Sequence, residues 1–295
     1  MVINHNPGAL FAVRCFGNTQ LALNRSMERL SSGMRINRAA DDAVGLAVSE
    51  KMRAQIRGLN VASSNAQNGF SMIQTAEGFL QGTQDVLHRL RELAVMSANG
   101  ILTAENRMLI QVEVSQLVAE LDRIANHAQF NGINLLTGRF ARPGGANVVT
   151  SSMWLHIGAN MDQQMRVFVS TMTAAALGVR DAGDNSFISL ADQESANRAI
   201  GTLDQALRRV SKERAHLGSY QSRLEFAVRS IEIAAENTQA SESRIRDTNM
   251  ATEMVTYTRK MILSQVGIAM MSHAFQQGMM ILRLLQPANG GNGWR

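Results

Sequence analysis

The feature that most constrains this chain is the seven-residue spacing of apolar residues at both of its ends. Near the start, one stripe follows steps of four and three, with Gln20 as its polar exception: Ala9, Val13, Phe16, Leu23, Met27, Leu30 and Met34. Near the end, a second row recurs every seven residues: Met254, Met261, Ile268, Phe275 and Leu282. Such spacing predicts amphipathic helices that pair as a coiled coil. Because a single helix cannot remove its own apolar stripe from water, each end of the chain needs partner helices.

The stripe near the end is too wide to be covered by one partner helix. Further apolar residues stand on other faces of the same predicted helix, among them Met250, Val255, Ile262, Met270, Met271 and Met279. A helix that is apolar on several faces needs several neighbours. Other copies of the same chain are the simplest supply of neighbours, so the sequence favours self-assembly.

The remaining helical signals lie in two blocks. Between about 45 and 98, two rows of mostly small and aliphatic residues recur every seven positions: Leu59, Ala66, Ile73, Leu80, Leu87 and Ala94, and beside them Ala62, Gly69, Ala76, Thr83, Leu90 and Ser97. Asn99 and Gly100 predict a helix end, and Thr103 with Glu105 predicts a new start. A second block over 200–235 keeps the same periodicity, with polar Arg214 and Gln221 within its seam.

The segment from about 130 to 190 differs from both helical blocks. Turn signals at 131–132, 143–145 and Gly183 separate short runs at 153–157 and 166–170, which predict strands in hairpins. With 3 Pro and 5% aromatic residues, the composition suits long helices elsewhere. The predicted fold is mainly α: a long antiparallel coiled coil or helical bundle formed by the N- and C-terminal segments, with a small β-hairpin region in the middle.

Signals for catalysis or metal binding are weak. The single Cys15 excludes an intramolecular disulfide, the 6 His lack metal-ligand spacing, and no phosphate-binding loop or nucleophile elbow is present. The adjacent acids Asp41 and Asp42 fit a metal or acid–base site less well than a helix start. Rows of Met more often form a core or an interface than a cofactor site. The sequence therefore predicts no catalytic residue, no metal and no cofactor, and a protein that is not an enzyme.

The charge and hydropathy of the chain limit the classes of partner and the cellular location that we expect. The net charge of +5 comes mostly from arginines that alternate with acidic residues, which favours solvated or interface helix faces over a nucleic-acid patch. No window of about eighteen uninterrupted apolar residues predicts a membrane span. Residues 1–8 lack the basic and apolar regions of a signal peptide, which by general export rules predicts a cytosolic protein.

Several blocks of sequence together resemble bacterial flagellin: LSSGMRINRAADDAVGLAVSEKMR at 30–53, NAQNG at 65–69, IQTAEG at 73–78, RLRELAV at 89–95, AQFNGINLLTG at 128–138 and SESRIRD at 241–247. The runs SMWLHIGAN at 152–160, STMT at 170–173 and ILRLLQ at 281–286 are similar to the core flagellins of spirochaetes, whose filaments lie in the periplasm. The resemblance implies a structural subunit that polymerises into the flagellar filament core for motility.

The resemblance also implies a domain plan. Residues 1–40 and 245–286 would pair as a terminal coiled-coil domain (D0), and 41–240 would form a helical rod domain (D1) that includes the β-rich segment, with 287–295 as a flexible tail. Contacts in the filament core are then expected at Phe16, Leu23, Leu30, Met254, Met261, Ile268, Phe275 and Leu282. Export through the flagellar apparatus without a cleaved signal would replace the cytosolic expectation, giving a flagellar location: periplasmic in a spirochaete, extracellular otherwise.

The partners implied by the resemblance are further flagellin subunits, identical or paralogous, a sheath protein, hook-junction and cap proteins, and an export chaperone on the C-terminal helix. Toll-like receptor 5 is a further implied partner, through positions that match Arg89, Leu93 and Glu113, although helix packing explains these residue types equally well. Neither nucleic acid nor membrane insertion is expected.

Three other functions remain open at this stage. A hook–filament junction protein, or another axial protein, would share the paired terminal helices but form a single ring. A chemoreceptor-like helical hairpin would require membrane spans or a docking module. A secreted helical translocator would require a long apolar hairpin.

Overall fold

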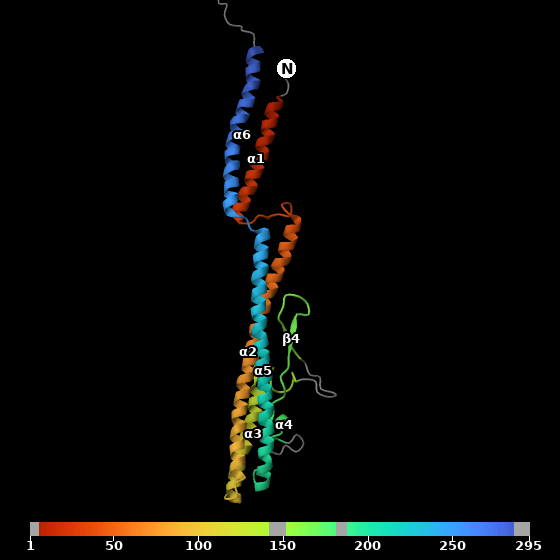
Figure 1. Cartoon of the computed structure of the whole chain (residues 1–295), viewed down its shortest axis with the longest axis vertical. Coiled ribbons are helices and arrows are strands. Elements are labelled where there is room, and N and C mark those ends of the chain that lie inside the picture. The colour runs from red at the N-terminus through yellow and green to blue at the C-terminus, as the bar shows by residue number, and fades with distance from the viewer. Residues whose placement is uncertain (1–5, 142–151, 181–187, 286–295) are drawn as a thin grey trace, which may run out of the picture. The chain divides into compact units, whose positions relative to one another are not determined.

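The computed structural model describes residues 6–141, 152–180 and 188–285, with the side chains of 278 and 281–285 left out. Within these ranges, six helices and four short strands follow the order α1 (Pro7–Ser32), α2 (Ala43–Ser97), α3 (Ala104–His127), β1 (Gln129–Phe130), β2 (Ile133–Asn134), β3 (Met153–His156), β4 (Gln164–Val167), α4 (Ala174–Leu177), α5 (Gln193–Arg246) and α6 (Met250–Leu285) (Figure 1). The predicted mainly α fold with a small β region is confirmed. The tail 287–295, the turn at 143–145 and Gly183 lie outside the described residues.

Contacts along the chain divide it into two compact units. The terminal unit comprises Met1–Arg53 and Thr238–Arg295, and the central unit comprises Ala54–Asn237. The division into D0 and D1 at residues 40 and 245 stays a prediction. Over the described ranges, none of the helices combines the length and apolarity that crossing a bilayer requires.

The ends of α1 are set by local signals. The Asn6 side chain accepts a hydrogen bond from the Ala9 N–H at 3.0 Å, and Pro7 occupies the first turn, where its missing N–H costs nothing. At the other end Gly33 adopts φ 71°, a left-handed conformation that glycine adopts without strain, and its N–H bonds to the Arg29 carbonyl.

The two terminal helices are joined at their base by backbone contacts. The Arg35 N–H donates to the Arg246 carbonyl at 2.6 Å, and the Thr248 N–H donates to the Gly33 carbonyl at 2.9 Å. Together with the antiparallel bridge between Met34 and Asp247, these bonds form a clasp from which α1 and α6 run side by side (Figure 1). The clasp fixes the end of α1 relative to the start of α6.

In the central unit, α2, α3 and α5 share one hydrophobic core. Both of the predicted seven-residue rows of α2 are buried, which confirms that part of the periodicity. Leu80 and Leu87 of α2 pack in the same core as Leu121 of α3 and Leu217 of α5, all at 0% exposure. The predicted helix stop is also confirmed, since α2 ends at Ser97 and Thr103 caps α3.

Polar side chains also bridge α2 and α5 within this bundle. Arg214 donates to Gln84 Oε1 at 2.7 Å and lies 3.4 Å from Glu77 Oε1, while Gln221 donates to Glu77 Oε2 at 3.1 Å. The two polar positions in the predicted seam therefore find partners on α2. Half-buried polar groups that are paired in this way favour one alignment of the helices over others.

The antiparallel β3–β4 hairpin packs on α2 through small residues. A Cβ added at Gly69 would lie 2.6 Å from the Leu155 side chain, and one at Gly58 would lie 3.0 Å from Ala159. On the exposed side of the hairpin, the Arg166 guanidinium stacks 3.9 Å from the centre of the Trp154 ring. The first predicted strand is found, ending one residue before 157, and the second covers 164–167 where 166–170 was expected.

Candidate functional site

The face of α6 that turns toward α1 is made mostly of polar and small residues. Between residues 253 and 274, the buried or half-buried positions of α6 are Glu253, Thr256, Tyr257, Lys260, Ser264, Gly267, Met271 and Ala274. Among the described side chains of this helix, Ser264 alone is buried. We call Lys260, Ser264, Gly267, Met271 and Ala274 the inner stripe; its alternating steps of four and three place it along one side of the helix.

Hydrogen bonds join the inner stripe to α1 at two levels. Lys260 Nζ donates to the Ser26 hydroxyl at 2.8 Å and to the Ala22 carbonyl at 3.2 Å. Ser26 is fully buried, so the lysine ammonium satisfies a hydroxyl that water does not reach. One turn further along α6, the Ser264 hydroxyl lies 3.5 Å from Gln20 Oε1.

Close packing and a further polar contact continue this seam toward the far end of the pair. A Cβ added at Gly267 would lie 3.2 Å from the Phe16 ring, so the glycine admits the aromatic side chain. The Asn6 side-chain amide donates to the Ala274 carbonyl at 2.9 Å. The contacts between the two helices are thus mainly polar or small, with Phe16 and Leu23 as apolar members from α1.

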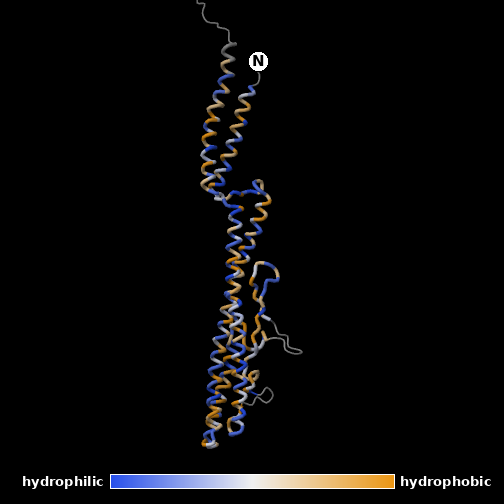
Figure 2. Tube along the Cα trace, viewed as in Figure 1, coloured by the Kyte–Doolittle hydropathy of each residue, from blue (hydrophilic) through white to orange (hydrophobic). Residues whose placement is uncertain are grey.

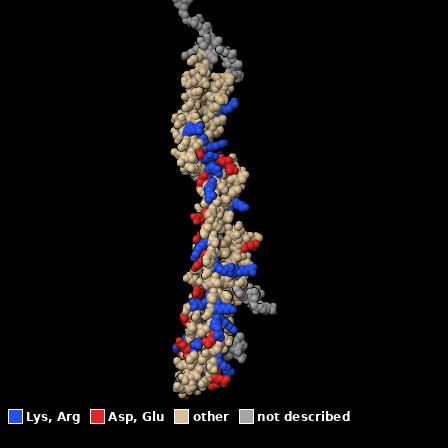
Figure 3. All heavy atoms as spheres, in the orientation of Figure 1, with Lys and Arg blue, Asp and Glu red and all other residues tan. Residues whose placement is uncertain are grey.

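The large apolar residues of the pair lie instead on its outside. Side chains that are 39–70% exposed are found at Leu10, Phe11, Val13, Leu21 and Met27 of α1 and at Met250, Met254, Val255, Met261, Ile262, Leu263, Val266, Ile268, Met270, Phe275, Met279 and Met280 of α6. Figure 2 shows hydrophobic residues recurring along both helices, and on the face drawn in Figure 3 much of the pair carries no charge. An apolar surface of this extent marks an interaction site.

The expected filament-core residues divide into two sets. Leu23 is buried against α6, and Phe16 and Leu30 are half-buried, so the members from α1 are largely used within the chain. Met254, Met261, Ile268 and Phe275, which we call the outer row, are 39–56% exposed. The side chain of Leu282 lies outside the described residues.

The three positions expected to meet an innate receptor lie in the central unit. The Arg89 guanidinium bridges from α2 to Glu113 of α3 at 2.8 Å and reaches Glu92 at 3.3 Å. The hydrogen bond that Arg89 donates to the Glu113 carboxylate raises the pKa of Arg89. Leu93 is only 2% exposed, so it packs inside the bundle. The structure therefore shows an ion pair on the surface above a core leucine.

A second group of exposed apolar residues surrounds the turn between α2 and α3. It comprises Val95, Met96, Ile101, Met108, Leu109 and Val112, each between 50% and 86% exposed. Sequence periodicity did not single these residues out, because none of them belongs to a predicted seven-residue row.

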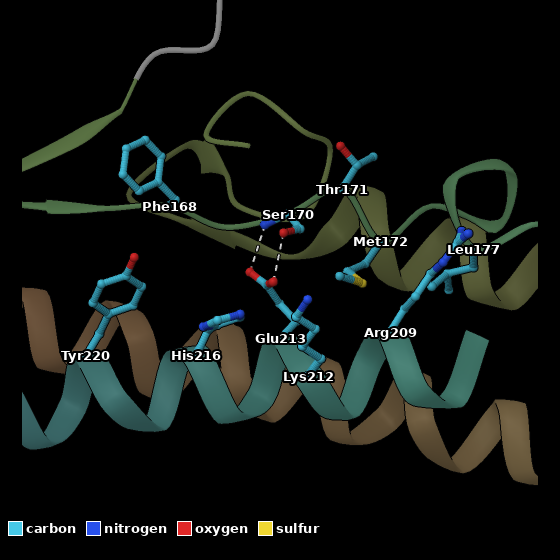
Figure 4. A pocket seen from close by; sticks show the side chains of 10 residues that line it. All are labelled: Phe168, Ser170, Thr171, Met172, Leu177, Arg209, Lys212, Glu213, His216 and Tyr220. Carbon is cyan, nitrogen blue, oxygen red and sulfur yellow. Dashed lines mark hydrogen bonds between the residues drawn. The ribbon is translucent and has the colours of Figure 1, made fainter. Parts of the chain in front are cut away.

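A cavity of about 310 Å³ separates α5 from the chain that follows β4 (Figure 4). In its wall the buried Glu213 accepts hydrogen bonds from the Ser170 N–H at 2.8 Å and from the Ser170 hydroxyl at 2.7 Å. Because the carboxylate holds both groups, its evident role is to fasten this segment to α5. Throughout the described residues, no three His, Cys, Asp or Glu side chains gather as a metal site would require.

The comparisons with known proteins agree with the resemblance noted in the sequence. The model of the bacterial flagellin N-terminal helical region matches residues 3–141, and that of the C-terminal helical region matches 200–285. The flagellar filament 33 kDa core protein of Treponema phagedenis is 65% identical over 97% of this chain and 100% of its own length. Flagellin FlaB2 of Treponema pallidum (strain Nichols) is 63% identical over the same shares.

Among solved structures, one described as a flagellar hook-associated protein from Vibrio parahaemolyticus is similar with a TM-score of 0.56 and 15% identity. The similarity covers 70% of this chain and 100% of that one. At this level of identity the likeness concerns the fold alone.

Proposed function

The chain belongs to the bacterial flagellin family and is a structural subunit of the flagellar filament, and from that premise we propose that the exposed apolar faces of α1 and α6 drive its polymerisation. The observation that supports this proposal is the outward position of the large apolar residues on the terminal pair. In a single chain, Met254 and Phe275 stay about half exposed. Neighbouring copies would cover them.

The free energy gained on polymerisation can be approximated from the apolar side chains that are exposed in the single chain. Fully burying a large apolar side chain contributes about 1.5–3 kcal/mol. The four members of the outer row are each 39–56% exposed, so each would add roughly half of that value on contact with a neighbour. This gain, repeated over both helices, would offset the entropy lost when each subunit is fixed in the filament.

In this mechanism the terminal unit and the central unit have different roles in assembly. The terminal helices would be exported partly unfolded, because they lack the neighbouring copies that cover their apolar faces, and would order fully at the growing end of the filament. The central unit would arrive folded around its own core, and the apolar group at the α2–α3 turn offers it a separate contact with other subunits. Contacts between central units would set the helical shape that converts rotation into thrust.

We extend the proposal to location and partners. The similarity to filament core proteins of Treponema supports a filament inside the periplasm. We propose in addition that the chain is exported without a cleaved signal. The expected partners are identical or paralogous flagellins, a sheath protein, hook-junction and cap proteins, and an export chaperone that binds α6 before assembly. Recognition by Toll-like receptor 5 stays a prediction, and it would have to involve the Arg89–Glu113 pair, since Leu93 is buried.

Electron microscopy separates this function from that of a hook–filament junction protein. Purified full-length chain, induced to polymerise by salt and imaged in negative stain, is expected to form long filaments. Filaments that disappear below a critical concentration of the chain would agree with a filament subunit. Closed rings of fixed size, or a monomer that never polymerises, would contradict the proposal.

A further inference from the structure

The orientation of α6 about its own axis is not explained by hydrophobic burial. Apolar residues occupy most sides of this helix, so turning Met261, Ile268 and Phe275 toward α1 would bury more apolar surface than the observed arrangement. The chain instead turns Lys260, Ser264 and Gly267 inward. The clasp at the base fixes where α6 begins, but it lies more than a turn away from these residues.

Polar contacts are the feature that distinguishes the observed orientation. A charged donor at Lys260 reaches two acceptors on α1, the buried Ser26 hydroxyl and the Ala22 carbonyl. A rotation of α6 by one residue, about 100°, would remove the ammonium from both acceptors and leave Ser26 inside the seam without its donor. A single polar residue at an inward position of a coiled coil is known to select one arrangement at a cost in stability.

We propose that Lys260 is the residue that selects which face of α6 turns to α1, and so keeps the outer row free for neighbouring subunits. Gly267 supports the same orientation, because an added Cβ would lie 3.2 Å from the Phe16 ring and crowd it. The consequence for assembly is specific: a chain whose α6 rotates would bury its own outer row, becoming more self-sufficient and a poorer filament subunit. The inference deepens the proposed function and depends on it for this consequence.

The test reads helix orientation by disulfide cross-linking in the full-length chain, with Cys15→Ser as the background. One reporter carries Gln20→Cys with Ser264→Cys, which are neighbours in the seam. The second reporter carries Gln20→Cys with Gln265→Cys, one residue round the helix and exposed. The ratio of the first cross-link to the second, measured on non-reducing gels in pellet and supernatant, reports the orientation of α6.

The decisive variant is Lys260→Met, and its matched control is Arg259→Met, which removes an exposed cation from the adjacent position. Lys260→Met is expected to lower the cross-link ratio about tenfold, the preference that one hydrogen bond from a charged donor supports, and to reduce the pelleted fraction. Arg259→Met is expected to change neither. An unchanged ratio in Lys260→Met would overturn the proposal.

A second variant covers the case in which Lys260→Met loses both cross-links through unfolding of the pair. Ser26→Ala leaves the lysine in place and removes one of its two acceptors, so it should lower the ratio in the same direction by a smaller factor. An unchanged cross-link ratio in Ser26→Ala would then contradict the proposal. If the Cys15→Ser background chain with the seam reporter forms the cross-link but never pellets, the proposed function alone is contradicted. If the chain forms filaments and Lys260→Met leaves the cross-link ratio unchanged, this inference alone is contradicted.

Discussion

Replacing Phe275 tests how much of the polymerisation energy comes from the outer row. Its side chain is 56% exposed in the single chain, and full burial of a phenylalanine contributes about 1.5–3 kcal/mol. Contact with a neighbour would therefore add about 1–1.5 kcal/mol, so Phe275→Ala should raise the critical concentration for polymerisation about five- to tenfold. Phe275→Asp places an unpaired carboxylate in the same contact, at a cost of several kcal/mol, and should abolish filaments at ordinary concentrations.

The assay is sedimentation of full-length chain over a series of concentrations, with circular dichroism to show that the central unit stays folded. Met161→Ala is the matched control, because it removes a side chain that is 87% exposed on the β3–β4 turn, in the central unit. That control should leave the critical concentration unchanged. Critical concentrations within twofold of the parent value for both Phe275 variants would refute the reasoning, because the outer row would then contribute nothing to contacts between subunits.

Three further predictions concern folding within each unit. Leu87→Ala removes a fully buried side chain from the central core and should lower the free energy of unfolding by about 2–5 kcal/mol, seen as a lower Tm. Gly69→Ala puts a methyl group 2.6 Å from the Leu155 side chain and should speed hydrogen exchange across β3 and β4, while Gly78→Ala, where nothing lies within 4 Å, should not. The backbone N–H of Arg38 holds the pKa of Asp41 below its ordinary value, so the stabilisation of this turn is present above the unfolded pKa and is lost as pH falls through the folded pKa. An NMR titration of the Asp41 carboxyl checks the direction, and a midpoint at or above the ordinary value would contradict it.

Much of the fold could be predicted because local signals and periodicity agree in the central unit. The seven-residue rows of α2 lie inside the core from Leu59 to Ser97, and the Asn99–Gly100 stop and Thr103 cap mark the turn to α3. Arg214 and Gln221 were visible as polar positions in a seam, but only the structure shows that Glu77 and Gln84 receive them. Partners so distant in sequence leave no periodic signal.

The terminal unit is where the pattern of residues was least informative. Because α6 is apolar on several sides, periodicity identified the row from Met254 to Phe275 but not the side that meets α1. The structure turns that row outward and places Lys260 and Ser264 inside. One signal in the sequence did point to this seam: Gln20, the polar exception in the stripe of α1, lies against Ser264.

The central claim is that α1 and α6 acquire their stability from other subunits, and hydrogen–deuterium exchange of monomer and filament tests it most directly. In the monomer, amides of both terminal helices are predicted to exchange quickly, while those of α2 and α5 in the central core are protected; in the filament all four should be protected. Terminal helices that are as well protected in the monomer as in the filament would contradict the account.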